Sequence, residues 1–288
     1  MGFEFQLQKN SLNTNIDWIH LDSKDSSAGQ GNQILDESHL AFVGPPFEMS
    51  PPVFGVRRVD AELKNNFDNV SINLEKIFST SEEWLSAKIS GGINFLYVKQ
   101  TIATTFSDLV GSYPTPYSYP LPPDPSFNFN IQSISQFIGA GPDLGVGIQL
   151  SLFKGLSLVG AASSSLNVGT VSVQENFKAT SKRLQQTGIG LSRQQIITPN
   201  KTQIVPGFDG RLGLAYEIKS KQISSFSIEG GYRLMSYLNA ISTTAPQTRV
   251  QPGINPETPE FSTGTIAIVS TTQQDRPFNS CYAHKLVV

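Results

Sequence analysis

Residues 206–241 contain two segments in which apolar and polar side chains alternate, joined by a short polar turn around Lys221 and Gln222. Successive side chains of a β-strand face opposite sides, so this alternation predicts two antiparallel strands, each with an apolar and a polar face. The apolar residues of these strands include Leu212, Leu214, Tyr216, Ile218, Phe226, Ile228 and Tyr232. The charged residues on the opposite faces are Arg211, Glu217, Lys219, Glu229 and Arg233. A fold for this chain must therefore give the two faces different surroundings.

The same alternation recurs along the chain. Further alternating segments lie at 3–8, 16–21, 57–78, 84–106, 138–152, 156–177 and 278–288. Short connections alternate with long polar ones at 24–55, 107–135, 182–204 and 242–276. This asymmetry is typical of outer-membrane barrels, and several segments reach the ~9–11 residues that a tilted membrane strand needs. We therefore predict one all-β domain over residues 1–288, an antiparallel up-and-down transmembrane β-barrel with about nine strands and long extracellular loops.

Composition argues against other classes of protein. Charged residues make up only 15% of the chain and the formal net charge is −2, whereas nucleic-acid binding needs a concentrated basic surface. No stretch approaches the ~18 apolar residues of a membrane-spanning helix. A soluble β-sandwich is the remaining alternative, but it would more often have shorter strands at a regular spacing of ~8–12 residues. The barrel is the better prediction.

The strand count and the start of the chain point to one explanation. A bacterial barrel with both ends in the periplasm needs an even number of strands, yet nine alternating segments are found. Met1-Gly2-Phe3 leads directly into a strand-like segment, without the basic, apolar and small-residue regions of a secretory signal peptide. We expect that one upstream strand and the export signal are missing from this chain, unless a strand has been miscounted.

Motifs for catalysis or cofactor binding are weak. The segment Gly139-Ala-Gly141-Pro-Asp-Leu-Gly145 resembles a dinucleotide-binding loop, but such a loop must open a helix, and here two-residue alternation continues to Leu152. The three histidines have no second His or Cys at metal-ligand spacing; they are His20, His39 and His284. We therefore expect no catalytic residues, no metal site, no cofactor and no enzymatic activity.

Several short motifs follow one another in the order found in a known family. They are Asp68-Asn-Val-Ser-Ile-Asn-Leu74, Ala87-Lys-Ile-Ser-Gly-Gly92, Phe137-Ile-Gly-Ala-Gly-Pro142, Phe208-Asp-Gly-Arg-Leu-Gly-Leu-Ala-Tyr216 and Ser227-Ile-Glu-Gly-Gly-Tyr232. Together they resemble the Legionella major outer membrane protein family, over nearly all predicted strands and none of the loops. The resemblance implies a surface-exposed outer-membrane β-barrel with porin-like activity, sometimes involved in attachment to host cells. The chain departs from the family pattern at both ends, because the signal peptide, the first strand and a terminal aromatic residue are absent.

The two faces of a membrane barrel have predictable roles. In hydrocarbon every backbone amide must be paired within the protein, so the sheet has to close on itself. We expect the apolar face named above to contact lipid and the charged face to line the lumen, together with Glu75 and Lys88 from earlier strands. Lumen charges of both signs predict weak ion selectivity, and a barrel of about ten strands leaves only a small or partly plugged pore.

Two functions are compatible with this prediction. The first is a porin-like conduit for passive passage of small solutes or ions. The second is a surface adhesin or structural barrel whose long loops bind host or partner surfaces. Membrane lipid and the outer-membrane assembly machinery are the expected partners in both cases, and nucleic acid is not expected as a partner. The sequence leaves open whether the protein forms a homo-oligomer. Conductance of the refolded protein in a planar bilayer would separate the two functions.

Overall fold

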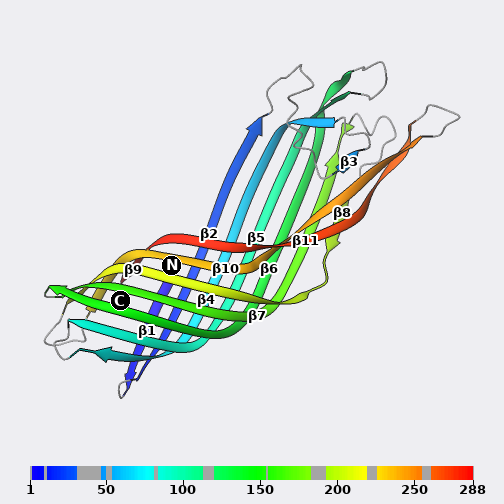
Figure 1. The fold of residues 1–288 in the computed structure, drawn as a ribbon. Helices are drawn as coiled ribbons and strands as arrows, with labels where there is room; N and C mark the ends of the chain where they lie inside the picture. Colours follow the sequence, from blue (N-terminus) through cyan, green and yellow to red (C-terminus); the bar gives the residue numbers. More distant parts are fainter. Residues whose placement is uncertain are drawn as a thin grey trace.

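The computed structural model describes residues 2–9, 12–30, 47–49, 54–80, 84–112, 120–153, 155–182, 193–218, 226–254 and 261–287. Nearly all of them lie in one sheet that curls into a half-barrel (Figure 1). Nine strands cross the sheet in chain order: β1 (Gly2–Lys9), β2 (Leu12–Gln30), β4 (Phe54–Ser79), β5 (Leu85–Ser112), β6 (Pro120–Phe153), β7 (Leu156–Thr180), β9 (Lys201–Ile218), β10 (Phe226–Ile254) and β11 (Phe261–Val287). Two short strands, β3 (Phe47–Met49) and β8 (Arg193–Ile197), pair with β10 and β7 outside this path. The predicted all-β, antiparallel, up-and-down arrangement is confirmed. Among the described residues, no helix is long and apolar enough to cross a membrane.

The strands run further than the sequence pattern indicated. Strand residues occupy large parts of the segments expected to be loops, namely 24–30, 107–112, 120–135, 193–197, 201–204, 242–254 and 261–276. The predicted bounds of the loops 24–55, 107–135, 182–204 and 242–276 were therefore wrong, and their parts at 31–46, 113–119, 183–192 and 255–260 lie outside the described residues. Where both faces of a sheet meet water, backbone pairing can continue although the apolar alternation that signals a strand has ended.

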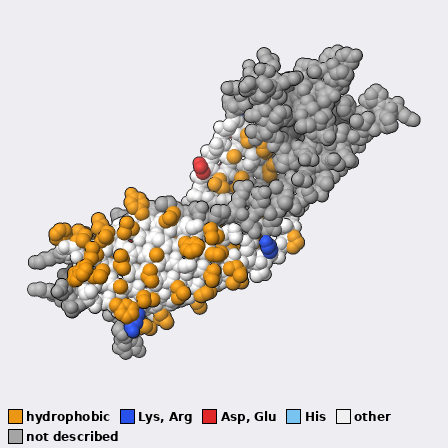
Figure 2. All heavy atoms as spheres, in the orientation of Figure 1, with side chains coloured by type: hydrophobic (Ala, Val, Ile, Leu, Met, Phe, Trp, Pro, Cys, Tyr) orange, Lys and Arg blue, Asp and Glu red, His pale blue; other side chains and the backbone are white. Residues whose placement is uncertain are grey.

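One face of the sheet, which we call the outer face, carries an apolar belt near the short turns. The belt consists of exposed apolar side chains on β2 (12–18), β4 (72–78), β5 (89–95), β6 (138–153), β7 (158–168), β9 (204–216) and β10 (228–238). Figure 2 shows these side chains covering the part of the sheet nearest the turns, with Lys and Arg only toward the borders of the face in view. An outward apolar band of this kind is the hallmark of a membrane barrel.

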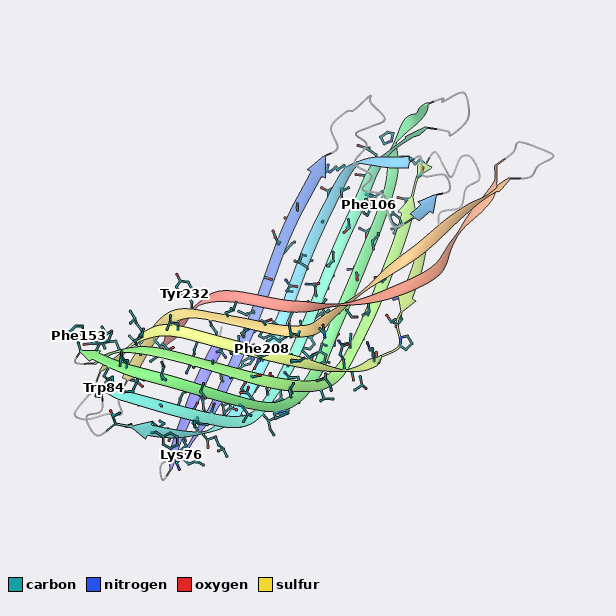
Figure 3. The ribbon with its side chains drawn as sticks, in the orientation of Figure 1. Lys76, Trp84, Phe106, Phe153, Phe208 and Tyr232 are labelled. Carbon is teal, nitrogen blue, oxygen red and sulfur yellow. The ribbon has the colours of Figure 1, made fainter. Side chains whose placement is uncertain are left out.

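Aromatic side chains gather at the border of the belt that lies beside the short turns. Figure 3 shows Trp84 and Phe153 at this end, together with Lys76. The Lys76 ammonium lies 5.4 Å from the centre of the Phe78 ring, within the range of a cation–π contact. Amphipathic aromatics and long basic side chains favour the boundary between hydrocarbon and water. This border therefore has the chemistry of a membrane interface.

The opposite, inner face holds an apolar layer across the interior. Leu21, Phe67, Val98, Phe137 and Val171 lie opposite one another in a single cross-strand row over β2, β4, β5, β6 and β7. Side chains of β10 pack against this row from the far side of the interior. Among the residues whose side chains are described, the apolar layer consists of Ile19, Phe67, Leu96, Val98, Phe137, Val171, Val173, Val205, Met235, Tyr237, Ala240 and Ile241, with Leu21 packed against it. Every member except Leu21 is at most 3% exposed, so the layer excludes water.

β6 and β7 are joined by a tight turn that includes Gly155. Phe153 lies opposite Leu156 in the ladder, which leaves two residues to reverse the chain. Gly155 has a φ of 81°, in the left-handed region that glycine adopts without a steric penalty. The short turn holds the ends of the two strands in register.

Gly141 on β6 marks a close approach of two strands. A Cβ added there would lie 1.7 Å from the carbonyl oxygen of Leu166 on β7. The ladder between these strands skips Gly141 and Pro142, and proline has no amide hydrogen to donate. The strand nevertheless continues through residues 139–145, which rules out the helix that a dinucleotide-binding loop requires.

Replacing Gly141 with alanine is expected to lower the free energy of unfolding by about 1–3 kcal/mol, because the added methyl group forces β6 and β7 apart. Urea titration followed by tryptophan fluorescence in detergent micelles measures the change. Gly210→Ala is the matched control, because a Cβ at Gly210 would meet nothing within 4 Å. Equal losses in the two variants would contradict the close approach.

Candidate functional site

Between the apolar layer and the short turns, the inner faces of the strands enclose a polar chamber. Its empty volume is about 690 Å³, part of it open to solvent. The alternation of side chains along β4 places polar groups here. Ile72 and Leu74 face outward, whereas Asn69, Ser71 and Glu75 occupy positions of the opposite face and line the chamber. The charged side chains that line the chamber are Asp17, Glu75, Lys88, Asp143, Asp209, Arg211 and Arg233. The chamber thus presents four carboxylates and three basic groups.

Glu75 on β4 is held by two donors from neighbouring strands. The Lys88 ammonium on β5 lies 2.9 Å from Glu75 Oε1, and Asn15 Nδ2 on β2 donates to the same oxygen at 3.0 Å. Glu75 is 3% exposed, so its charge depends on these partners in place of water. The arrangement leaves a neutral, hydrogen-bonded pair on this wall of the chamber.

Arg233 on β10 joins two carboxylates from different sides of the interior. Its Nε donates to Asp209 on β9 at 3.0 and 2.8 Å, and its Nη2 contacts the same carboxylate. The same Nη2 lies 2.8 Å from an oxygen of Asp17 on β2. β2 and β10 are not neighbours in the sheet, so this ion pair crosses the interior. A planar guanidinium with five donors is suited to bridging two carboxylates.

A third group of contacts connects the chamber with the apolar layer. Asn94 Nδ2 donates to Asn69 Oδ1 at 2.8 Å and to Ser71 Oγ at 2.9 Å. Asn69 Nδ2 in turn donates to the hydroxyl oxygen of Tyr237. The Tyr237 ring packs against Phe67, with ring centroids 5.6 Å apart. Tyr237 therefore presents its hydroxyl to the chamber and its ring to the apolar layer.

The residues predicted to line the lumen do not all reach the chamber. Glu75, Lys88, Arg211 and Arg233 line it, whereas Glu229 is half-buried on β10 and is not among the lining residues. The side chain of Glu217 is not described, and Lys219 lies outside the described residues.

The residues predicted to contact lipid lie on the outer face wherever their side chains are described. They are Leu212, Leu214, Tyr216, Ile228 and Tyr232, and all are exposed. Tyr232 is labelled in Figure 3 and is 72% exposed. Ile218 and Phe226 lie opposite one another in the ladder between β9 and β10, but their side chains lie outside the described part of the chain.

Sequence reasoning missed several groups of the chamber. Asp17, Asn69, Asp143 and Asp209 line it but were not predicted to do so. A signal was present, since each occupies a polar position of an alternating segment. Asp143 and Asp209 were obscured because they stand among glycines, where the alternation is hard to see. Within the described residues, no group of three or more His, Cys, Asp or Glu is placed to hold a metal ion.

Comparison with known proteins identifies the family. The model of the family described as Legionella pneumophila major outer membrane protein precursor matches residues 1–276, which confirms the resemblance found in the strand motifs. No curated protein and no solved structure matches the chain. The matched region spans the strands that form both the belt and the chamber. An all-β sheet with an outward apolar belt and a polar interior agrees with that match, and the chain belongs to the Legionella major outer membrane protein family of bacterial outer-membrane proteins.

Proposed function

We propose that this protein is a porin-like conduit through which small polar solutes or ions cross the outer membrane passively. The polar chamber carries the proposal, because a lumen that admits hydrated solutes must offer them donors and acceptors in place of water. The apolar belt supports it, since exposed side chains such as Leu144 and Leu212 would then contact lipid. The role is not enzymatic, and its chemistry is limited to solvation and charge.

Passage through the chamber follows from its electrostatics. A cation would meet carboxylates such as Asp143, and an anion would meet Arg211. Several of the charged groups that line the chamber form ion pairs with one another, as Glu75 does with Lys88 and Arg233 with Asp209. Paired charges of opposite sign produce little net field along the path of a solute. The conduit therefore discriminates weakly between cations and anions, and a barrel of so few strands admits only small solutes.

Refolded protein inserted in a planar bilayer is expected to give small conductance steps with weak ion selectivity, measured as a reversal potential close to zero in a salt gradient. The physical reason is the mixture of charges on the wall of the chamber. Protein that is folded and inserted but carries no current would rule out the conduit.

Two substitutions at one ion pair are expected to shift the reversal potential in opposite directions, so each serves as the control for the other. Glu75→Gln leaves Lys88 without its carboxylate partner and is expected to shift the reversal potential toward anion preference. Lys88→Gln leaves Glu75 unbalanced and is expected to shift it toward cation preference. These side chains are 2.9 Å apart, so a change at one position acts at the same point of the lumen as a change at the other. Shifts in the same direction would show that the current does not pass this pair.

Surface binding is the second candidate, favoured by the length of the strands beyond the belt. β6 continues for residues 120–137 before its belt begins, about 60 Å at the usual strand rise. Other strands of the sheet also carry charges beyond the belt, including Lys24 on β2, which lies 3.3 Å from Glu62 on β4. Hydrogen bonds from Lys64 and Lys24 lower the pKa of Glu62, so Glu62 keeps its charge at mildly acidic pH. Shortening residues 31–46 while keeping the strands would abolish attachment to cells but leave conductance intact.

A further inference from the structure

Residues 238–240 of β10 have no ladder partner on either side. Pairing with β9 ends at Tyr237 opposite Gly207, and the next residue of β9 is Pro206. Pairing with β11 stops at Tyr237 opposite Phe278 and resumes at Ile241 opposite Arg276, so three residues of β10 face Pro277 alone. Proline cannot donate a ladder hydrogen bond. The two prolines thus release β10 from both neighbours at the same level of the barrel.

The released segment bends into the interior. Asn239 has a φ of 61°, a left-handed conformation that asparagine tolerates better than most residues. Gln203 on β9 donates to the Asn239 carbonyl oxygen at 2.9 Å, which satisfies a group that the ladder no longer pairs. After this bulge, Ala240, Ile241 and Ser242 are all buried. A bulge re-aims the side chains that follow it, and here it directs them into the lumen.

Contacts across the interior hold the segment in place. The backbone amide of Ser242 donates to Ser135 Oγ on β6 at 2.9 Å, and β6 is not a neighbour of β10 in the sheet. Tyr237 packs against Phe67 and accepts a hydrogen bond from Asn69, both on β4. A Cβ at Gly207 would lie 2.6 Å from a carbon of the Tyr237 ring, so the absence of a side chain at Gly207 makes room for this ring.

The result is a dry layer above the polar chamber. Phe67, Val98, Phe137 and Val171 form one wall, and Tyr237 and Ile241 close the gap opposite them. These side chains are at most 3% exposed, so this described part of the layer is dry. Water and ions leave an apolar constriction because they lose hydrogen bonds and hydration there.

We propose that residues 237–242 of β10 are a movable barrier that closes the lumen against the apolar row, and that solutes pass when this segment withdraws toward the wall. The inference rests on the proposed conduit and adds the element that controls it. The prolines on the two neighbouring strands make withdrawal feasible, since residues 238–240 have no ladder partners that hold them in the inward position.

A reversible cross-link tests the barrier. In a Cys281→Ser background, Ser135→Cys and Ser242→Cys introduce a cysteine pair between β6 and the barrier, and a thiol oxidant then links them. Single-channel recordings of the refolded protein are expected to show a several-fold loss of open time after oxidation, reversed by dithiothreitol. Each single-cysteine variant should show no change under the same treatment.

Truncation of the barrier gives an independent measurement. Tyr237→Ala removes the ring that closes the layer and is expected to raise the mean conductance several-fold. Leu234→Ala is the matched control, because Leu234 lies on β10 outside the proposed barrier and faces outward. Should Tyr237→Ala fail to fold, the cysteine pair still decides the question within one folded protein.

The outcomes separate the two proposals. If the wild type conducts, and neither the cross-link nor Tyr237→Ala changes the current, the barrier is overturned and the conduit is not. Absence of current in the wild type, in the reduced cysteine pair and in folded Tyr237→Ala overturns the conduit and the barrier together.

Discussion

Arg233→Ala is expected to lower the free energy of unfolding by about 3–5 kcal/mol, the usual cost of removing one partner from a buried ion pair. Arg233 is 7% exposed and bonds to both Asp209 and Asp17. Without the guanidinium, these two carboxylates would remain close together in a poorly solvated interior. The substitution also removes an ion pair that crosses the lumen, because Asp17 lies on β2 and Arg233 on β10. Urea titration in detergent micelles, followed by the fluorescence of Trp18 and Trp84, measures the effect.

Two further variants identify the cause of that loss. Arg58→Ala is the matched surface control, since Arg58 lies 2.8 Å from Asp60 but its side chain is 53% exposed, and an exposed pair contributes only ~0–1 kcal/mol. Arg233→Lys keeps the charge but not the planar fork, so it should recover part of the stability only. An Arg233→Ala protein as stable as Arg58→Ala would show that the two carboxylates do not depend on Arg233.

Leu144→Arg is expected to lower the free energy of unfolding from lipid by about 2–4 kcal/mol, the usual cost of a basic residue at the midplane of a barrel's lipid face. Leu144 is 69% exposed and lies near the middle of the belt on β6, which extends from Ile138 to Phe153. A guanidinium at this point must either leave water or pull water and headgroups into the hydrocarbon. Folding equilibria in lipid vesicles, titrated with guanidinium chloride, measure the change.

Asn128→Arg is the matched control for this substitution. Asn128 lies on the same strand and the same face but sixteen residues away, outside the belt, and it is exposed. Its replacement should change the folding free energy by no more than about 0.5 kcal/mol, as for an ordinary surface site. Similar losses at Leu144 and Asn128 would mean that the belt does not contact hydrocarbon, and the assignment of the outer face to lipid would have to be given up.

The local pattern predicted the strands well and the loops poorly. Alternation over 206–241 placed Leu212 and Tyr232 on the outer face and Arg211 and Arg233 on the inner face, because side-chain direction follows from the pleat of a single strand. The same reasoning missed strand residues such as Ser107, which was assigned to a loop but lies opposite Arg58 in the ladder between β4 and β5. Polar residues on both faces carry no period, so backbone pairing there cannot be recognised without the partner strand.

The sequence by itself determined the class of fold, the order of the strands and the division of each strand into an apolar and a polar face, since these depend on two-residue periodicity and on the spacing of turns. Which polar groups meet depends on the three-dimensional arrangement of the strands, as when Asp17 and Asp209 share Arg233. So does the backbone conformation at Asn239, next to which Ala240 and Ile241 join the apolar layer. Those features depend on contacts between strands that are distant in the chain, and no local pattern of side chains specifies which distant residues lie on the other side of a lumen.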